Sequence, residues 1–331
     1  METATEVKVQ SSKPSKGVVP VIDRISFDLG NRVNALTDGD KIVHFPSYSD
    51  RLSAKQDLDF GLPDFVERRS FRVDIGAQSF KVGAIAGLLT AKPTFSGDKW
   101  AKAKEFLFAG LAALGIEENA HIKELRCSVP DDQDLAQRTP FELLANTAHQ
   151  FKINGHEYTV QIDAVQIAAE GKFAWLQACR DGLLMYPQYL NGVLDLGGGT
   201  AIARLIAPDG TIARDFEKVL QGGTSQLAAQ IAAECSLTGV EGQIMDAIAD
   251  GTFCVHAINF KNIYDALLPE WVEGIRAEMN KAWKPIQDQY AQILIVGGSA
   301  PIFAPFVDGN PRYVVAPNPQ FYGLEAMQSN G

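Results

Sequence analysis

The stretch Val193–Thr200, VLDLGGGT, places an acidic residue inside an apolar run that ends in three consecutive glycines. Glycines have no Cβ atom, so backbone N–H groups at such a turn can approach a phosphate chain closely. A carboxylate at the same point would repel phosphate, and its useful role is to hold hydrated Mg²⁺, which neutralises the phosphate oxygens. The sequence therefore predicts a phosphate-binding turn, with Asp195 contacting Mg²⁺ through water.

A related pattern occurs in the first half of the chain. Residues 25–31, ISFDLGN, are an apolar strand containing Asp28, and a turn at Asp38-Gly39 comes next. The later motif is followed in the same way by a turn at Asp209-Gly210. This weak internal repeat predicts two related domains that face each other. Asp28 in one half and Asp195 in the other would then hold Mg²⁺ through water, while the two turns clasp the β- and γ-phosphates.

A third glycine motif follows the last apolar strand of the second half. The sequence ILIVGGSA, residues 293–300, opens into Gly297, Gly298 and Ser299. Each motif alone has a plain structural explanation: a hairpin entry with a capping aspartate, a flexible turn, or a tight turn from strand to helix. Their order along the chain favours a nucleotide cleft over three unrelated turns.

Strand and helix patterns alternate along the chain, which favours an α/β architecture over a bundle or a sandwich. Apolar alternation predicts strands within 22–28, 32–45, 70–83, 121–130, 149–167, 193–196, 204–216 and 293–300, with hairpins at 32–45, 70–83 and 204–216. Helical spacing predicts helices at 98–114 with Asp98 as its cap, 131–147 interrupted by Pro140, 172–185, 223–234, 240–249, 259–284 and 319–328.

The composition is that of a globular chain. Its 331 residues are enough for two domains with separate cores, and 46% of them are hydrophobic. No apolar run reaches membrane-spanning length, and residues 1–20 have the composition of a flexible leader. The four cysteines are far apart, which argues against zinc or disulfide sites and favours the cytoplasm. A net charge of −10 argues against direct nucleic-acid binding, so any DNA contact would go through a partner protein.

Three of these motifs carry a resemblance to a known superfamily. FDLGN at 27–31 and LDLGGGT at 194–200 resemble the two phosphate motifs of the actin-like ATPases, and ILIVGGSA at 293–300 resembles their adenosine motif. GGT at 222–224, just before a helix, makes the chain most similar to the ParM-like plasmid-segregation actins of bacteria and archaea. The resemblance extends over about residues 22–328.

The resemblance implies a duplicated, ribonuclease H-like α/β fold, in which each domain is a mixed sheet flanked by helices and the nucleotide lies in the cleft between them. Residues 21–186 would form domain I, residues 187–318 would form domain II, and the helix within 319–331 would return to domain I. This arrangement agrees with the internal repeat.

Matched motif by motif, the resemblance also implies which residues contact MgATP. The first phosphate loop contributes Asp28, Gly30 and Asn31, the second contributes Asp195, Gly197, Gly198, Gly199 and Thr200, and the nucleoside loop contributes Gly297, Gly298 and Ser299. The lysine that the resembling proteins commonly place after the first loop is missing here, and the nearest basic residue is Arg32.

The segment AVQIAAEGKFAWL, residues 164–176, resembles the first connecting segment of these proteins, in which a Glu or Gln orients the attacking water. Glu170 fits that role best and Gln166 is the alternative, while the structural explanation of Glu170 is an ordinary glutamate at a helix start. Ala169 stands where the usual proline would precede the glutamate.

The resemblance implies ATP hydrolysis coupled to assembly of head-to-tail filaments for plasmid or DNA segregation or a related cytoskeletal task, and it leaves room for a DNA-binding adaptor protein. Two alternatives stay open: a sugar or acetate kinase of the same superfamily, with Asp163 as its base, and an actin-like scaffold that binds ATP without turnover. An Hsp70 chaperone is disfavoured because no substrate-binding half follows. A membrane-attached actin is disfavoured because neither terminus forms an amphipathic anchor.

Overall fold

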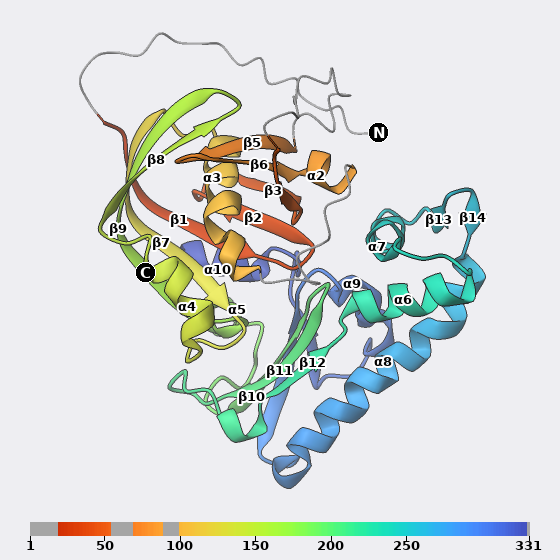
Figure 1. Cartoon of the computed structure of the whole chain (residues 1–331). Coiled ribbons are helices and arrows are strands. Elements are labelled where there is room, and N and C mark those ends of the chain that lie inside the picture. Colours follow the sequence, from red (N-terminus) through yellow and green to blue (C-terminus); the bar gives the residue numbers. More distant parts are fainter. Residues whose placement is uncertain (1–18, 54–68, 89–98, 330–331) are drawn as a thin grey trace.

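The computed structural model describes residues 19–53, 69–88 and 99–329. The predicted leader, apart from its last two residues, and the predicted Asp98 cap lie outside these ranges. Figure 1 shows two halves, each built around its own sheet: the first part of the chain, coloured red to yellow-green, forms one half, and the green to blue part forms the other.

The first half contains a nine-stranded sheet in the order β3-β2-β1-β7-β9-β8-β5-β6-β4. Its strands are β1 (Val21–Leu29), β2 (Val33–Thr37), β3 (Ile42–Pro46), β4 (Ser49–Arg51), β5 (Ser70–Ile75), β6 (Gln78–Gly83), β7 (Asn119–Val129), β8 (Thr147–Ile153) and β9 (His156–Ala169). The helical segments described here are α2 (Ala84–Leu88), η2 (Trp100–Lys102), α3 (Ala103–Ala113), α4 (Leu135–Glu142) and α5 (Lys172–Arg180).

The second half contains a five-stranded sheet in the order β12-β11-β10-β15-β16 and a separate two-stranded ribbon. The strands are β10 (Leu190–Leu196), β11 (Thr200–Ile206), β12 (Lys218–Gln221), β13 (Cys254–Val255), β14 (Ile258–Asn259), β15 (Tyr290–Val296) and β16 (Tyr313–Val315). The helical segments are η3 (Arg214–Phe216), α6 (Thr224–Glu234), α7 (Glu241–Ala249), α8 (Lys261–Trp283), η4 (Lys284–Ile286), α9 (Ala300–Phe303), η5 (Ala304–Phe306) and α10 (Tyr322–Ser329).

Both sheets share one topology. Strand β1 is antiparallel to β2 and parallel to β7, and β10 is antiparallel to β11 and parallel to β15. The next neighbours, β9 and β16, are again parallel. The orders β3-β2-β1-β7-β9 and β12-β11-β10-β15-β16 are therefore equivalent. The weak repeat in the sequence is confirmed as a duplicated fold.

Alternation along β1 explains why its acidic residue can lie in an apolar strand. Phe27 and Leu29 are buried in the core that includes residues of α3. Because successive side chains of a strand point to opposite faces, Ser26 and Asp28 lie on the other face. The Ser26 hydroxyl there donates to Oε1 of Gln328 in α10, at 2.9 Å.

The same alternation operates in β10. Leu194 and Leu196 are buried in a core that includes residues of α6 and α8, whereas Val193 packs in a different core with Trp175 of α5. Asp195 shares the Val193 face, since it is two residues further along the strand. The two aspartates thus belong to the sheet faces that look toward α5 and α10, not to the faces covered by α3 or α8.

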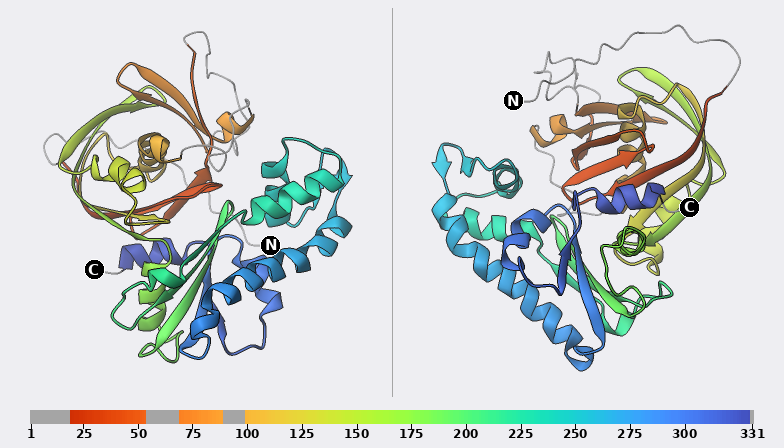
Figure 2. Two further views of the ribbon diagram at one scale, coloured as in Figure 1. Left: turned by 60° about the horizontal axis from the view of Figure 1, so that its bottom comes forward. Right: turned by 180° about the vertical axis from the view of Figure 1, so that it is seen from behind.

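Helices α5 and α10 lie between the two sheets (Figure 2). In α5, Ala178 packs with residues of the second sheet, while Phe173 packs in a cluster with Ala35 of β2. Helix α10 contacts β1, β2 and α5, and its Tyr322 hydroxyl donates to Asp181 at 2.7 Å. The last helix therefore returns to the first half of the chain.

Two predicted helices end earlier than the sequence pattern indicated. Helix α4 ends at Glu142 instead of 147, and Pro140 lies inside it without interrupting it. Proline has no N–H to donate to the carbonyl of Ala136, four residues earlier, and the helix ends two residues after it. Helix α5 ends at Arg180 instead of 185, because Gly182 adopts a left-handed conformation (φ +69°) one residue after the C-cap.

The hairpin predicted across Asp209-Gly210 is also wrong in part. Ile206 and Ile212 form an isolated bridge after the turn, but the chain then enters η3. The partner of β11 is β12, which begins only at Lys218. The strand pattern in TIARDF was thus too short to be distinguished from a single bridge followed by a 3-10 turn.

We expect Leu324→Ala to lower the free energy of unfolding by about 2–4 kcal/mol, because this buried α10 side chain packs against the residues between the two sheets. Ser329→Ala, an exposed position at the end of the same helix, is the matched control and should change stability by less than about 0.5 kcal/mol. Urea unfolding of both variants measures the difference. Equal stability of the two variants would show that α10 is not part of the core.

Candidate nucleotide site

The side-chain ammonium of Lys99 connects the end of β1 to the turn after β9. Lys99 lies in the turn before η2, and its side chain is buried. Its Nζ donates to the carbonyl oxygen of Leu29 at 2.8 Å and lies 4.0 Å from Oε1 of Glu170. The structure thereby brings the water-positioning candidate Glu170 to the loop that begins with Asp28.

Burial is the largest cause that raises the pKa of Asp28, from its ordinary value of 3.8 to about 6, and the negative charge of Glu170 adds to it. Burial also raises the pKa of Asp195, to about 7, followed by the charges of Glu170 and Asp28. Lys99 lowers the pKa of both aspartates, and Arg204 lowers that of Asp195. These mutual effects show that the three carboxylates lie within electrostatic reach of one another.

The loop at residues 197–199, predicted as the second phosphate loop, is held by the residues at the start of α6. The carbonyl of Gly199 accepts from the N–H of Gly222, and the carbonyl of Gly198 accepts from the N–H of Ser225, both at 2.8 Å. Since each peptide group is planar and trans, the N–H that follows a carbonyl points the opposite way. The N–H group of Gly199 therefore points away from α6. A Cβ atom at Gly223 would lie 2.1 Å from the Gly197 carbonyl oxygen, so this close approach requires glycine.

The two predicted phosphate loops face each other directly. A Cβ atom on Gly199 would lie 2.6 Å from Nδ2 of Asn31, and one on Gly198 would lie 3.1 Å from Cβ of Arg32. In the first loop, a Cβ atom on Gly30 would lie 2.1 Å from the carbonyl oxygen of Val33, the first residue of β2. The glycines are thus the residues that let these loops come together, and the pair forms the kind of backbone cradle that suits a phosphate chain.

Arg32 does not supply a cation to this cradle. Its Nε donates to Oδ1 of Asp246 in α7 at 3.1 Å, and its guanidinium forms a salt bridge with the same carboxylate. Close by, a Cβ atom on Gly242 of α7 would lie 2.6 Å from the Tyr48 hydroxyl. These contacts connect the first half of the chain to α7 of the second half beside the two loops.

The third glycine motif lies against the second phosphate loop. A Cβ atom on Gly297, whose φ is +95°, would lie 2.7 Å from Oδ1 of Asp195. The Ser299 hydroxyl donates to the Gly197 carbonyl at 3.2 Å and also hydrogen-bonds the hydroxyl of Thr224 in α6. Ser299 thus joins the loops internally. At Gly298 the nearest atom to an added Cβ would be 3.8 Å away, so this glycine has more open surroundings than the other glycines of the three motifs.

The backbone of Glu170 is held from both halves of the chain. Its N–H donates to the Val129 carbonyl at 2.8 Å, and its carbonyl accepts from the guanidinium of Arg204 in β11. Arg204, only 1% exposed, also donates to the Pro130 carbonyl and pairs with Glu217 at 2.7 Å. The position of Glu170 therefore depends on contacts between the two sheets.

Gln166 and Asp163 are not brought to the cluster. Gln166 is exposed three residues before the end of β9, opposite Arg126 of β7. It precedes Glu170 by four residues, which correspond to about 13 Å along a strand. Asp163 lies further back and contacts Nε2 of His121 at 2.6 Å. The geometry favours Glu170 over Gln166 as the water-positioning candidate and does not support Asp163 as a catalytic base.

Sequence reasoning missed Lys99 and Arg204. Lys99 looks like an ordinary basic residue near a helix start, and Arg204 looks like a surface residue in a strand. Both are buried cations that act through contacts with distant segments, and such contacts leave no local pattern. An arginine in a run of otherwise apolar strand residues, AIARLI, was the one available indication.

Among the described residues, no group of three or more His, Cys, Asp or Glu side chains is placed to ligate a metal ion directly. Of the helices within the described ranges, none is long and apolar enough to cross a membrane.

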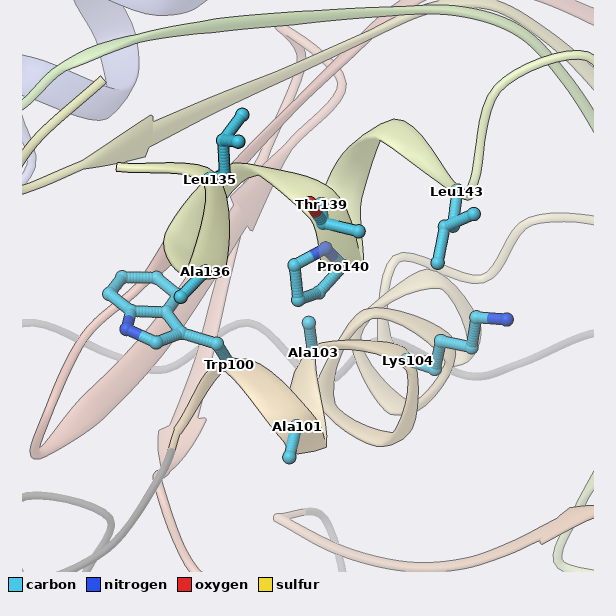
Figure 3. Close-up of a pocket in the computed structure, with 9 residues that line it drawn as sticks. All are labelled: Trp100, Ala101, Ala103, Lys104, Leu135, Ala136, Thr139, Pro140 and Leu143. Carbon is cyan, nitrogen blue, oxygen red and sulfur yellow. The ribbon is translucent and has the colours of Figure 1, made fainter. Parts of the chain in front are cut away.

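A hollow of about 570 Å³ lies elsewhere, between the start of α3 and α4 (Figure 3). Its lining is largely apolar and includes Trp100, Leu135 and Pro140. None of the predicted nucleotide contacts lines it. The predicted site at the loops between the two sheets is therefore separate from this hollow.

The two equivalent sheets, with a helix pair between them and glycine loops meeting at their ends, define an actin-like fold. Comparison with known structures shows the same class. The ParM protein of psk41 in its apo form matches with a TM-score of 0.68 at 17% identity, over 93% of this chain and 96% of that one. An archaeal actin homologue matches with a TM-score of 0.74 at 16% identity, over 92% and 98%.

The actin-like protein Alp7A matches with a TM-score of 0.71 at 15% identity, over 93% of this chain and 95% of that one. Neither a model of a protein family nor a curated protein sequence matches the chain. At these identities the comparisons establish the ParM-like, actin-like fold, which the motifs predicted.

Without nucleotide, the buried Asp28 carboxylate should destabilise the fold. Its folded-state pKa of about 6 lies above the ordinary value, so the folded state binds more protons, and the free energy of unfolding falls as pH rises from about 4 to about 7. We expect Asp28→Asn to raise this free energy by about 1–3 kcal/mol at pH 8, and by less at pH 5.

The matched control for this prediction is Asp23→Asn in the same strand. Asp23 is exposed, and its hydrogen bond with Lys123 lowers its pKa, so removing its charge should give no gain at pH 8. Thermal unfolding of both variants from pH 5 to pH 8 measures the effect. Lower stability of Asp28→Asn at pH 8 would contradict the account of the cluster.

Proposed function

We propose that the chain binds MgATP between its two halves and hydrolyses it. The proposal rests on the pair Asp28 and Asp195. Burial raises the pKa of both carboxyl groups, and both lie beside the two glycine loops that face each other. Burying two carboxylates beside a third is unfavourable unless a cation offsets their charge. Residues 21–186 with the last helix would form one wall of the site, and residues 187–318 the other.

In this proposal the first loop (Asp28, Gly30, Asn31) and the second loop (Asp195 and 197–200) bind the phosphates. Gly297 and Gly298 support the nucleoside, and Ser299 holds their loop to α6. Asp28 and Asp195 would hold Mg²⁺ through water, and the ion would supply positive charge to the phosphate oxygens. Glu170 orients the attacking water, and the loop N–H groups stabilise charge that develops on the transferred phosphoryl group.

We also propose that the nucleotide controls assembly into head-to-tail filaments. Among the structures with this fold, one is a 15-stranded ParM filament from Clostridium botulinum and another is an Alp12 filament. The archaeal actin homologue has also been observed in complex with ADP. A cytoplasmic role in plasmid or DNA segregation, through a DNA-binding adaptor, is the cellular task that fits such a filament.

The kinase alternative loses its support, since Asp163 lies outside the cluster. The non-hydrolysing scaffold is the second candidate, because Ala169 replaces the usual proline before Glu170. The two remaining hypotheses differ in one measurable property: an ATPase releases phosphate, whereas a scaffold only binds nucleotide.

The test uses right-angle light scattering and phosphate release in the same sample after MgATP is added. We expect scattering to rise and then to decay as phosphate appears. Glu170→Ala should lower the hydrolysis rate about 10²–10³-fold, since it removes the group that orients water, and its assemblies should persist. Glu157→Ala, an exposed position at the far end of β9, is the control and should behave like the wild type.

Flat scattering with normal phosphate release would contradict the filament. Nucleotide binding without phosphate release would favour the scaffold. Equal hydrolysis by Glu170→Ala and the wild type would remove Glu170 from the proposed mechanism.

A further inference from the structure

We infer that Lys99 is the cation that binds the terminal phosphate of the nucleoside triphosphate, an inference that rests on the proposed function. The lysine expected shortly after the first phosphate loop is missing from the sequence, and the basic residue that follows the loop, Arg32, is paired with Asp246. Lys99 approaches the same loop from a different element, the turn before η2.

The position of the ammonium identifies which phosphate it meets. Nζ of Lys99 is 2.8 Å from the carbonyl oxygen of Leu29, which lies between Asp28 and Gly30 of the first loop. It is also 4.0 Å from Oε1 of Glu170, the group proposed to orient water. The water must attack the terminal phosphorus, so a cation between the first loop and Glu170 is on the side of the terminal phosphate.

The surroundings of Lys99 direct its charge inward. The residue is only 7% exposed, and Nζ packs over the ring of Trp100, 4.4 Å from its centroid. Trp100 in turn lines the apolar hollow between α3 and α4 (Figure 3). A buried ammonium is unfavourable unless charged or polar partners offset its desolvation, and here those partners lie on the side of the loops.

The other two cations around the site are committed to direct partners. Arg204 pairs with Glu217 at 2.7 Å and donates to two carbonyls, and Arg32 forms its salt bridge with Asp246. The nearest carboxylate to Lys99 in the described residues is 4.0 Å away. An ammonium has three N–H donors, and the Leu29 carbonyl accounts for one. Lys99 can therefore form a charge-assisted hydrogen bond with a phosphate oxygen.

The experiment measures the affinities of a non-hydrolysable ATP analogue and of ADP, each with Mg²⁺, for the wild type, Lys99→Met and Lys99→Arg. We expect Lys99→Met to weaken binding of the triphosphate at least tenfold and binding of ADP less than threefold. Lys99→Arg, which keeps the charge, should recover much of the triphosphate affinity. A purely structural role would weaken both nucleotides alike, so the ratio of the two affinities is the decisive readout.

Lys102→Met is the matched control, because Lys102 also donates to a carbonyl, that of Ser49 at 2.7 Å, and lies three residues further along. Its affinity ratio should equal that of the wild type. Circular dichroism confirms folding of each variant, and if Lys99→Met does not fold, the ratio for Lys99→Gln decides. If Lys99→Met leaves the ratio of triphosphate to ADP affinity unchanged, the inference about Lys99 is overturned and the proposed function is not affected. Absence of nucleotide binding by the wild type overturns both the inference and the proposed function.

Discussion

Burial of neighbouring carboxylates is the constraint on which this structure depends. Asp28, Asp195 and Glu170 come from different strand ends, and each of the two aspartates has its pKa raised by burial and by the charge of its neighbours. The described residues offset this charge with Lys99 and Arg204 only. A fold maintains such an arrangement at a cost in stability, and that cost is explained if a cation and a phosphate chain belong there.

The duplicated fold supplies the geometry for this cluster. In each sheet the third strand in the order, β1 or β10, carries an aspartate as its second-last residue, on the face that looks toward α5 and α10, because the adjacent residues are needed in the core. Arg204 then connects the second sheet to the carbonyls of Pro130 and Glu170 in the first half. Any rotation of one half against the other would disturb these bonds. The water-positioning candidate is thereby coupled to the relative position of the two halves.

Much of this arrangement was predictable from the sequence. The motifs at Asp28, Asp195 and Gly297 are local, because a glycine turn after an apolar strand leaves a pattern within a few residues. The repeat of strand, Asp-Leu-Gly and hairpin predicted the duplication that the sheet orders confirm. Roles that arise from contacts between distant segments were not predictable. Lys99 donates to the carbonyl of Leu29, which is 70 residues away in the sequence, and the Ser299 hydroxyl donates to the carbonyl of Gly197 in another loop. The prediction of a hairpin at Asp209-Gly210 was wrong in part because a short strand cannot be distinguished from a single bridge by its sequence pattern alone.

The most direct measurement is calorimetric titration with preformed MgADP at pH 7, in buffers of different ionisation enthalpy. The account predicts binding with net release of roughly half a proton, because Asp195, whose pKa is raised to about 7, ionises when the metal arrives. Asp195→Asn should lose most of this release. Binding without proton release in the wild type, or no binding at all, would contradict the claim that the buried carboxylates form a magnesium–nucleotide site.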